Sequence, residues 1–279
     1  MTFKTIVAVV QGEKDEDRLL DCVLPLANHF KSHVIGVHAE VMPVSYTTPM
    51  GFPDAEFIQI SSERNVKRAA ELGQRYSARC LAEGVSAEWR SMESFSGDSA
   101  LSSLSSARSA DLIVAVQSNP DGDSISGANL EGLLFEAGRP VLFIPYAAPV
   151  TATFRKVLIA WNGSKEAARA VFDALPFIMD ADETEILVVD AEEDADAESE
   201  AVGTEIAASL GRHGVHATVV NEKSAGLSVG TVIENHAAEA KPDLIVMGAY
   251  SHSWLREFLF GGTTRTLLQS MPVPTFMSR

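Results

Sequence analysis

The chain has 279 residues, enough for two domains of ordinary size that each bury a hydrophobic core. Its 46% hydrophobic and 22% charged residues are the balance of a soluble globular protein. A formal net charge of −16 argues against nucleic acid or an anionic membrane as a partner, because both are bound through clustered Lys and Arg.

No apolar run reaches the roughly 18 to 20 residues that span a bilayer. The apolar start, Met1 to Val10, lacks the basic residues and cleavage site of a signal peptide, so a cytoplasmic location is expected. Cys22 and Cys80 stand in helix-like surroundings without CxxC spacing. They are expected to be buried free thiols, and no metal site is predicted.

The sequence contains two copies of one module. Phe3 to Gly12 resembles Phe154 to Gly163 at an offset of 151 residues (154 − 3). Later matches fall at an offset of 132, namely Asp111 to Ala115 with Asp243 to Met247, and Pro140-Val141 with Pro272-Val273. We therefore predict two modules, residues 1–150 and 151–279, joined by a linker from Tyr146 to Thr153. The extra length of the first copy is assigned to a proline-rich loop, Met42 to Phe57.

Apolar strand-like runs alternate with helical patterns in both halves. The predicted strands are Thr5–Val10, Val34–Ala39, Ser86–Ser91, Asp111–Val116 and Val141–Pro145, then Lys156–Trp161, Glu185–Ala191, His216–Asn221, Leu244–Gly248 and Val273–Met277. This alternation predicts an α/β fold in which each module is a five-stranded parallel sheet with helices on both faces. Ligands of such sheets bind beyond the carboxyl ends of the strands, where the strand order reverses.

One stretch near the C-terminus combines a buried strand with a glycine-rich turn. The run from Asp243 ends at Gly248, and Gly261-Gly262 then precede Thr263 and Thr264 at the start of a helical pattern. Glycines let a ligand approach the backbone, and a helix start offers free N–H groups to an anion. A tight turn into the helix is the alternative interpretation.

These residues resemble the universal stress protein family. Its nucleotide-binding members carry Gly-x-x-Gly, nine residues, then Gly-Ser/Thr between the fourth strand and the last helix. Gly248, Gly261 and the nine-residue spacer His252 to Phe260 match this pattern, while Ser251 and Gly262 depart from it. Thr264 falls where the family uses a hydroxyl.

The resemblance implies a fold, a ligand and a set of contacts. Two modules of the adenine nucleotide hydrolase-like, Rossmann-like type would pair antiparallel through their last strands, which gives a pseudo-two-fold dimer within one chain. The ligand would be ATP or another adenine nucleotide, with or without Mg²⁺. The residues implied around triphosphate and ribose are Met247, Gly248, Ser251, Gly261, Gly262, Thr263 and Thr264. Those implied around the base are Ala160, Asn162 and Ala191.

The first copy is predicted to lack this site. Gln117 is expected to occupy the position of Gly248, and no Gly-Gly-Thr-Thr precedes the last helix of this copy. Gln11 stands where the family often has an aspartate, a position that Asn162 fills in the second copy. One nucleotide site per chain is therefore expected.

Other patterns have simpler explanations. Gly226-x-Ser228-x-Gly230 matches a hydrolase nucleophile elbow, but residues 221–225 separate it from the preceding strand, so Ser228 is predicted to cap a helix. Ser164 is predicted to cap the helix after Asn162-Gly163 whether or not a ligand binds. Arg265 could neutralise phosphate or pair with Glu257.

Three functions follow, in order of preference. The first is a stress-response regulatory or protective module that binds adenine nucleotide in its second half, with at most slow ATP hydrolysis because no general base is evident. The second is a scaffold whose site has decayed at Ser251 and Gly262, acting through an unidentified protein partner. The third is an enzyme that uses the crevice for another small molecule. Whether two chains assemble further is left open.

Overall fold

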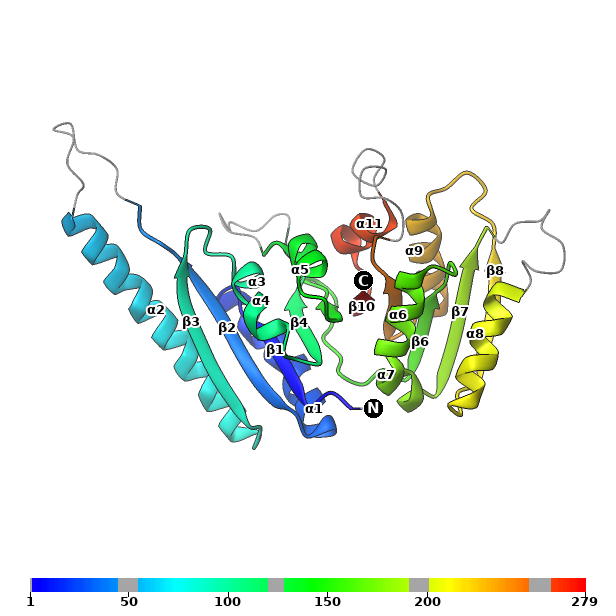
Figure 1. Cartoon of the computed structure of the whole chain (residues 1–279), viewed down its shortest axis with the longest axis horizontal. Helices are drawn as coiled ribbons and strands as arrows, with labels where there is room; N and C mark the ends of the chain where they lie inside the picture. The colour runs from blue at the N-terminus through cyan, green and yellow to red at the C-terminus, as the bar shows by residue number, and fades with distance from the viewer. Residues whose placement is uncertain (1, 45–54, 120–127, 191–200, 251–261) are drawn as a thin grey trace.

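The computed structural model describes residues 2–44, 55–119, 128–190, 201–250 and 262–279. Its ten strands form one sheet through the length of the molecule, with helices on both faces (Figure 1). The strands of the first half are β1 Thr5–Val9, β2 His33–Val41, β3 Ala87–Ser94, β4 Leu112–Val116 and β5 Val141–Ile144. Those of the second half are β6 Lys156–Ala160, β7 Glu183–Val189, β8 Ala217–Glu222, β9 Leu244–Gly248 and β10 Thr275–Ser278.

The helices lie between these strands along the chain. They are α1 Glu13–Phe30, α2 Ala55–Ala82, α3 Ser99–Ser102, α4 Leu104–Ala107, α5 Leu130–Glu136, α6 Lys165–Asp173, α7 Leu175–Asp180, α8 Ala201–Arg212, α9 Val229–Ala240 and α11 Thr263–Ser270. No described helix is long and apolar enough to cross a membrane.

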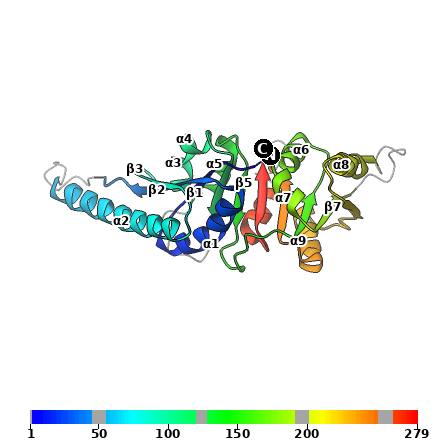
Figure 2. The ribbon, with the colours of Figure 1, turned by 90° about the horizontal axis from the view of Figure 1, so that it is seen from below.

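The strand order is β3-β2-β1-β4-β5-β10-β9-β6-β7-β8. Within each half all pairings are parallel, and the halves meet where β5 and β10 pair antiparallel, with Phe143 opposite Thr275 and Val141 opposite Met277. Figure 2 shows β10 (red) beside β5 in the middle of the molecule. The predicted α/β fold, all ten strands and the antiparallel seam are confirmed.

The last strand of the second half starts later than predicted. The N–H of Ile113 donates to Pro140, and the N–H of Ile245 donates to Pro274. Pro140 therefore corresponds to Pro274, so matching it with Pro272 was wrong by two residues, and β10 begins at Thr275 rather than Val273.

The alignment of Gln117 with Gly248 was also wrong, by one residue. The N–H of Gln117 donates to the last residue of β5, and the N–H of Ala249 donates to the last residue of β10. Gln117 thus corresponds to Ala249, and Val116 to Gly248, as the offset of 132 requires.

The longer first half owes much of its length to a helix. α2 has 28 residues, whereas the described part of α8, in the equivalent position, has 12. In Figure 2, α2 extends to one end of the molecule. Because α2 begins at Ala55, the predicted loop from Met42 to Phe57 was wrong at its end, and residues 45–54 lie outside the described part.

Two hydrophobic clusters fill the space between the sheet and its helices. One includes residues of α1, α2, α6, α7 and α8, and the other residues of α3, α4, α5, α9 and α11. The first cluster continues across the seam, because Phe177 packs against Phe3 (ring centroids 5.0 Å apart) and Phe30 (5.6 Å) of the first half and against Phe276 (6.0 Å) of its own half. Both halves therefore share one core on this face.

Both cysteines are free and buried, as predicted. Burial raises the pKa of Cys22 to about 12, because the apolar interior disfavours the thiolate, and the charge of Asp21 adds to the effect. The Cys22 thiol lies 3.6 Å from the carbonyl oxygen of Thr151, in the predicted linker.

Candidate functional site

A cavity of about 250 Å³ lies in the second half, where β6, β7 and β9 end. Strand β6 lies between β7 and β9, so the chain moves outward in opposite directions from this point and the strand order reverses. This is the edge at which open α/β sheets bind ligands. The cavity is lined by Ala160, Trp161, Asn162, Leu187, Val189, Val229, Ile233, Met247, Gly248, Thr263 and Thr264.

The structure brings six of the ten predicted site residues to this cavity. They are Ala160, Asn162, Met247, Gly248, Thr263 and Thr264. Gly262 is placed at the start of α11 but is not among the lining residues. Ala191, Ser251 and Gly261, with the spacer His252 to Phe260, lie outside the described residues.

Five lining residues were not predicted. Trp161 lies between two predicted positions, and Leu187 and Val189 stand near the end of β7. Val229 and Ile233 come from the first turns of α9, whose apolar pattern resembles that of any core-facing helix. Trp161 directly follows β6, and this position at the carboxyl end of a strand could have predicted its place in the cavity wall.

The loop after β6 is held by its own polar side chains. The Asn162 side-chain oxygen accepts from the N–H of Ser164 over 3.1 Å, and the Ser164 hydroxyl accepts from the N–H of Ala167 over 3.1 Å. Gly163 between them has a φ of 70°, which favours glycine. The predicted cap at Ser164 is confirmed, and Asn162 contributes to the turn as well as to the cavity wall.

Gly248 is required by packing. A Cβ at this position would lie 2.4 Å from the backbone nitrogen of Ala167 and 2.5 Å from the carbonyl carbon of Glu166. Helix α6 therefore packs closely on the end of β9, and this glycine has a structural role that does not depend on a ligand.

Helix α11 begins at the cavity. Gly262 has extended backbone angles and no side-chain capping bond, and its carbonyl accepts from the N–H groups of Arg265 and Thr266. The first N–H groups of any helix lack helical acceptors, and the positive end of the helix dipole lies there. Because Thr263 and Thr264 line the cavity, this helix end adjoins the space where a ligand would bind.

The hydroxyl of Thr264 has a protein partner. It is 2% exposed and accepts from the N–H of Tyr250 over 3.0 Å. Tyr250 has a φ of 55°, in the left-handed region, where a residue other than glycine costs roughly 1 kcal/mol or more. Thr264 therefore holds the chain leaving β9 against the start of α11.

The first half also contacts this region. The ring of Tyr250 lies 4.6 Å from that of Phe135 in α5, and the guanidinium of Arg265 lies 3.8 Å from Glu131. Arg265 was predicted to neutralise phosphate or to pair with Glu257. The ion pair that the structure describes is with Glu131 of the first half. Glu257 lies outside the described residues.

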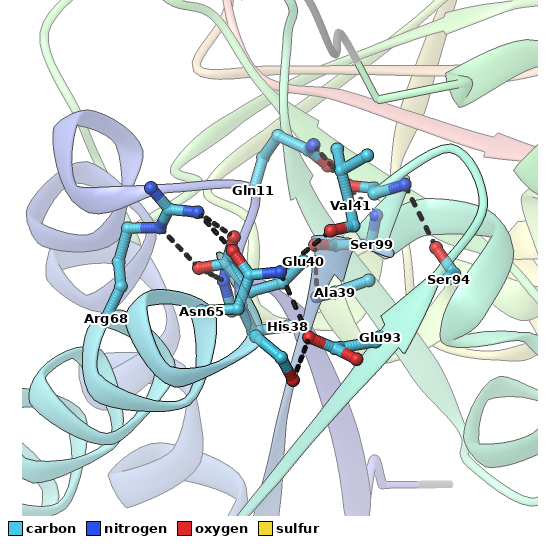
Figure 3. Close-up of polar contacts among 12 residues, drawn as sticks. Gln11, His38, Ala39, Glu40, Val41, Asn65, Arg68, Glu93, Ser94 and Ser99 are labelled. Atoms are coloured by element: carbon cyan, nitrogen blue, oxygen red, sulfur yellow. Dashed lines mark hydrogen bonds and ion pairs between the residues drawn. The ribbon is translucent and has the colours of Figure 1, made fainter. Parts of the chain in front are cut away.

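At the corresponding strand ends of the first half, side chains form hydrogen bonds with the chain itself (Figure 3). The Gln11 amide nitrogen donates to the carbonyl of Gly97 over 3.1 Å, and its oxygen accepts from the N–H of Ser99 over 3.1 Å. The starts of α3 and α5 are capped by the side chains of Asp98 and Asn129. The chain itself thus supplies a cap to the start of each of these two helices.

A charge network around the buried Glu40 lies at the end of β2 (Figure 3). Glu40 is 6% exposed and binds Arg68 through both carboxylate oxygens, while His38 and Asn65 complete the network. Burial opposes ionisation of Glu40, but hydrogen bonds from Arg68 and His38 outweigh it and lower its pKa. The network joins α2 to β2, and the polar side chains at this end of β2 bind to one another and to Arg68.

Ser228 caps α9, as predicted, and does not form a nucleophile elbow. Its hydroxyl oxygen accepts from the N–H of Thr231 over 3.1 Å and lies 2.8 Å from the Thr231 hydroxyl. It starts a regular helix instead of standing at a sharp turn directly after a strand.

Comparison with known proteins gives the family of the second half. Residues 153–279 match the model of the universal stress protein family. No curated protein sequence matches the chain.

Several solved structures match the whole fold. A universal stress protein from Archaeoglobus fulgidus covers 99% of this chain and 96% of its own, with 19% identity and a TM-score of 0.72. A functionally unknown protein from Pseudomonas aeruginosa covers 99% of this chain and 92% of its own, with 16% identity and a TM-score of 0.66. The chain thus shares a two-module architecture with both, and its residues 153–279 are similar to the universal stress protein family.

Proposed function

We propose that the second module binds one adenine nucleotide, ATP or a close relative, and that the protein acts in the cytoplasm as a regulatory or protective module in the stress response. The observation that carries this proposal is the cavity itself, which joins an apolar wall to the start of an uncapped helix.

The apolar part of the cavity suits a flat, weakly polar group. Leu187 and Val189 contribute from the sheet, and Val229 and Ile233 from α9. Ligand pockets are lined mostly by such residues, with a few polar groups that orient the ligand. A volume of about 250 Å³ is slightly below the range of such pockets, which begins at roughly 300 Å³. We place the base and ribose here.

The polar end suits phosphate. In a chain with a net charge of −16, an anion needs local stabilisation. The N–H groups and dipole at the start of α11 provide it without a charged side chain. Any Mg²⁺ would be held mainly by phosphate oxygens and water, as this ion commonly is.

Binding, without efficient catalysis, fits the lining residues best. None of the described residues that line the cavity is Asp, Glu, His, Lys or Arg. General acid or base catalysis needs a titratable group within hydrogen-bond reach of the reacting atoms. The site is therefore proposed to sense or store a nucleotide.

A scaffold without nucleotide is the second candidate. It is favoured by the hydroxyl of Thr264, which already accepts a protein hydrogen bond, and by Gly262, which offers none where the family has Ser or Thr. Such a protein would act through protein partners.

Denaturing extraction of freshly purified protein, followed by nucleotide chromatography and mass spectrometry, separates the two candidates. ATP titration calorimetry on the emptied protein gives the stoichiometry. We expect about one adenine nucleotide per chain. Absence of bound nucleotide, of titration heat and of any thermal shift with ATP and Mg²⁺ would reject the nucleotide site in favour of the scaffold.

A charge change at Gly262 tests the position of the phosphates. Gly262→Asp and Gly262→Asn both supply a good helix cap, so both should fold. Only Asp adds a negative charge at the proposed anion site, so it should weaken ATP binding at least about tenfold relative to Asn. Asn129→Asp, at the cap of α5 in the first module, is the matched control and should leave ATP affinity unchanged.

A further inference from the structure

We propose that Phe135 and Gln117 of the first module are positioning residues for the nucleotide site of the second. The proposal rests on the proposed function. Neither residue lines the cavity, yet both contact the elements that form its phosphate end.

Phe135 supports the turn that leaves β9. The centroid of its ring lies 4.6 Å from that of Tyr250, at an interplanar angle of 35°. The guanidinium carbon of Arg279 lies over the Phe135 ring, 3.9 Å from its centroid. Tyr250 is 8% exposed, has a φ of 55° and donates its N–H to Thr264 in the first turn of α11. A left-handed conformation at a non-glycine residue persists only where its surroundings hold it. Phe135 is one of those surroundings.

Gln117 supports the other end of the same helix. It is 3% exposed, its amide nitrogen donates to the carbonyl of Leu268 over 2.8 Å, and its amide oxygen accepts from the N–H of Tyr146 over 3.2 Å. A helical partner for the Leu268 carbonyl would be the N–H of residue 272, which is a proline and has none. The side chain of Gln117 therefore satisfies a carbonyl at the end of α11 and ties it to the segment after β5.

These contacts hold α11 at both ends. The helix has eight residues, too few to be stable without tertiary contacts. Its first turn is fixed through Thr264, Tyr250 and Phe135, and its last turn through Gln117. The direction of its N–H groups toward the cavity thus depends on the first module, which acts as a structural support for the site in the second.

The test compares seam variants on the two faces of the sheet. Phe135→Leu keeps an apolar side chain but removes the aromatic contact, and Gln117→Met keeps the approximate side-chain size but removes the amide donor. Phe3→Leu is the matched control, because Phe3 packs against Phe177 across the same seam at 5.0 Å but in the other hydrophobic cluster. Two readouts apply, the dissociation constant for ATP and hydrogen exchange of the α11 amides without ligand.

We expect Phe135→Leu and Gln117→Met to raise the dissociation constant about fivefold or more and to speed exchange in α11. Phe3→Leu should leave affinity and α11 exchange as in wild type, even where it lowers overall stability. Unchanged α11 exchange in both site-side variants, or an equal loss of affinity in Phe3→Leu, would overturn the proposal. Should the wild type bind no nucleotide, the proposed function fails, and α11 exchange still decides whether the first module positions the helix.

Discussion

The backbone N–H of Tyr250 donates to the hydroxyl of Thr264 over 3.0 Å, and this bond joins the end of β9 to the start of α11. The pair is buried, with Tyr250 8% and Thr264 2% exposed. Removing the acceptor from a buried pair costs the desolvation of the donor as well as the bond.

Thr264→Val should therefore lower the free energy of unfolding by about 1 to 3 kcal/mol, because valine has the shape of threonine without the acceptor. Thr264→Ser keeps the hydroxyl and should retain most of the stability. Urea denaturation of the three proteins measures the difference. Equal stability of the Val and Ser variants would show that the hydrogen bond contributes nothing.

Val229→Phe should block the cavity from its surface side. Val229 lines the cavity at the start of α9 and is 40% exposed, so a larger ring can enter the space without strain in the core. ATP affinity should fall about tenfold or more while the melting temperature stays within a few degrees of wild type. Leu227→Phe, two residues earlier, exposed and outside the cavity lining, is the control and should bind like wild type. If calorimetry shows that Val229→Phe binds ATP like wild type, the base does not bind in this cavity.

Gly248→Ala should destabilise the second module. The added Cβ would lie 2.4 Å from backbone in α6, which cannot move without shifting the helix, so we expect a loss of about 2 to 3 kcal/mol in unfolding free energy. Gly211→Ala in α8 meets no atom within 4 Å, and it should change stability by less than about 1 kcal/mol, in the stabilising direction. Comparable losses in the two variants, measured by chemical denaturation, would contradict close packing of α6 on β9.

His236 makes stability depend on pH. It lies between Glu185 and Glu222, and although burial of the ring favours the neutral form, hydrogen bonds to both carboxylates raise its pKa above the usual 6.5. Because the folded pKa is the higher one, the stabilisation is complete below about pH 6.5 and is lost as the pH rises through the folded value.

The difference in unfolding free energy between wild type and His236→Gln should therefore be larger at pH 5.5 than at pH 9. The change in this difference between the two pH values should be about 1 kcal/mol or less, because the group is partly solvated. Denaturation at the two pH values measures it. His213→Gln, an exposed histidine whose described contact is with the ring of Phe172, is the control. A pH-independent difference for His236 would remove the carboxylate pairing as a source of stability.

The sequence predicted the sheet because buried parallel strands are continuous β-branched and aliphatic runs, which few other structures contain. Its register at β10 was misjudged for a local reason. Pro272-Val273-Pro274 holds two prolines, and the match with Pro140 chose the first, whereas the hydrogen bond from Ile245 selects the second. Only the ladder between strands distinguishes them.

The candidate site was predictable only in part. Loop residues such as Asn162 and Gly248 carry turn chemistry that can be read from sequence. Ile233 looks like any core residue of an amphipathic helix, and its place in the cavity wall follows from tertiary packing. The amide of Gln117 reaches a carbonyl 151 residues away, and no local pattern encodes that partner.

The antiparallel pair of β5 and β10 lies within one chain, joined by the segment between β5 and β6. Two separate copies of a module would meet with an affinity set by their concentration, whereas tethered partners stay together on dilution. Two identical subunits must also share every substitution. A tandem chain is free of that constraint, so Gln11, Asp98 and Asn129 can form hydrogen bonds within the first half while residues at the strand ends of the second half line a cavity, and each half can specialise without altering its partner.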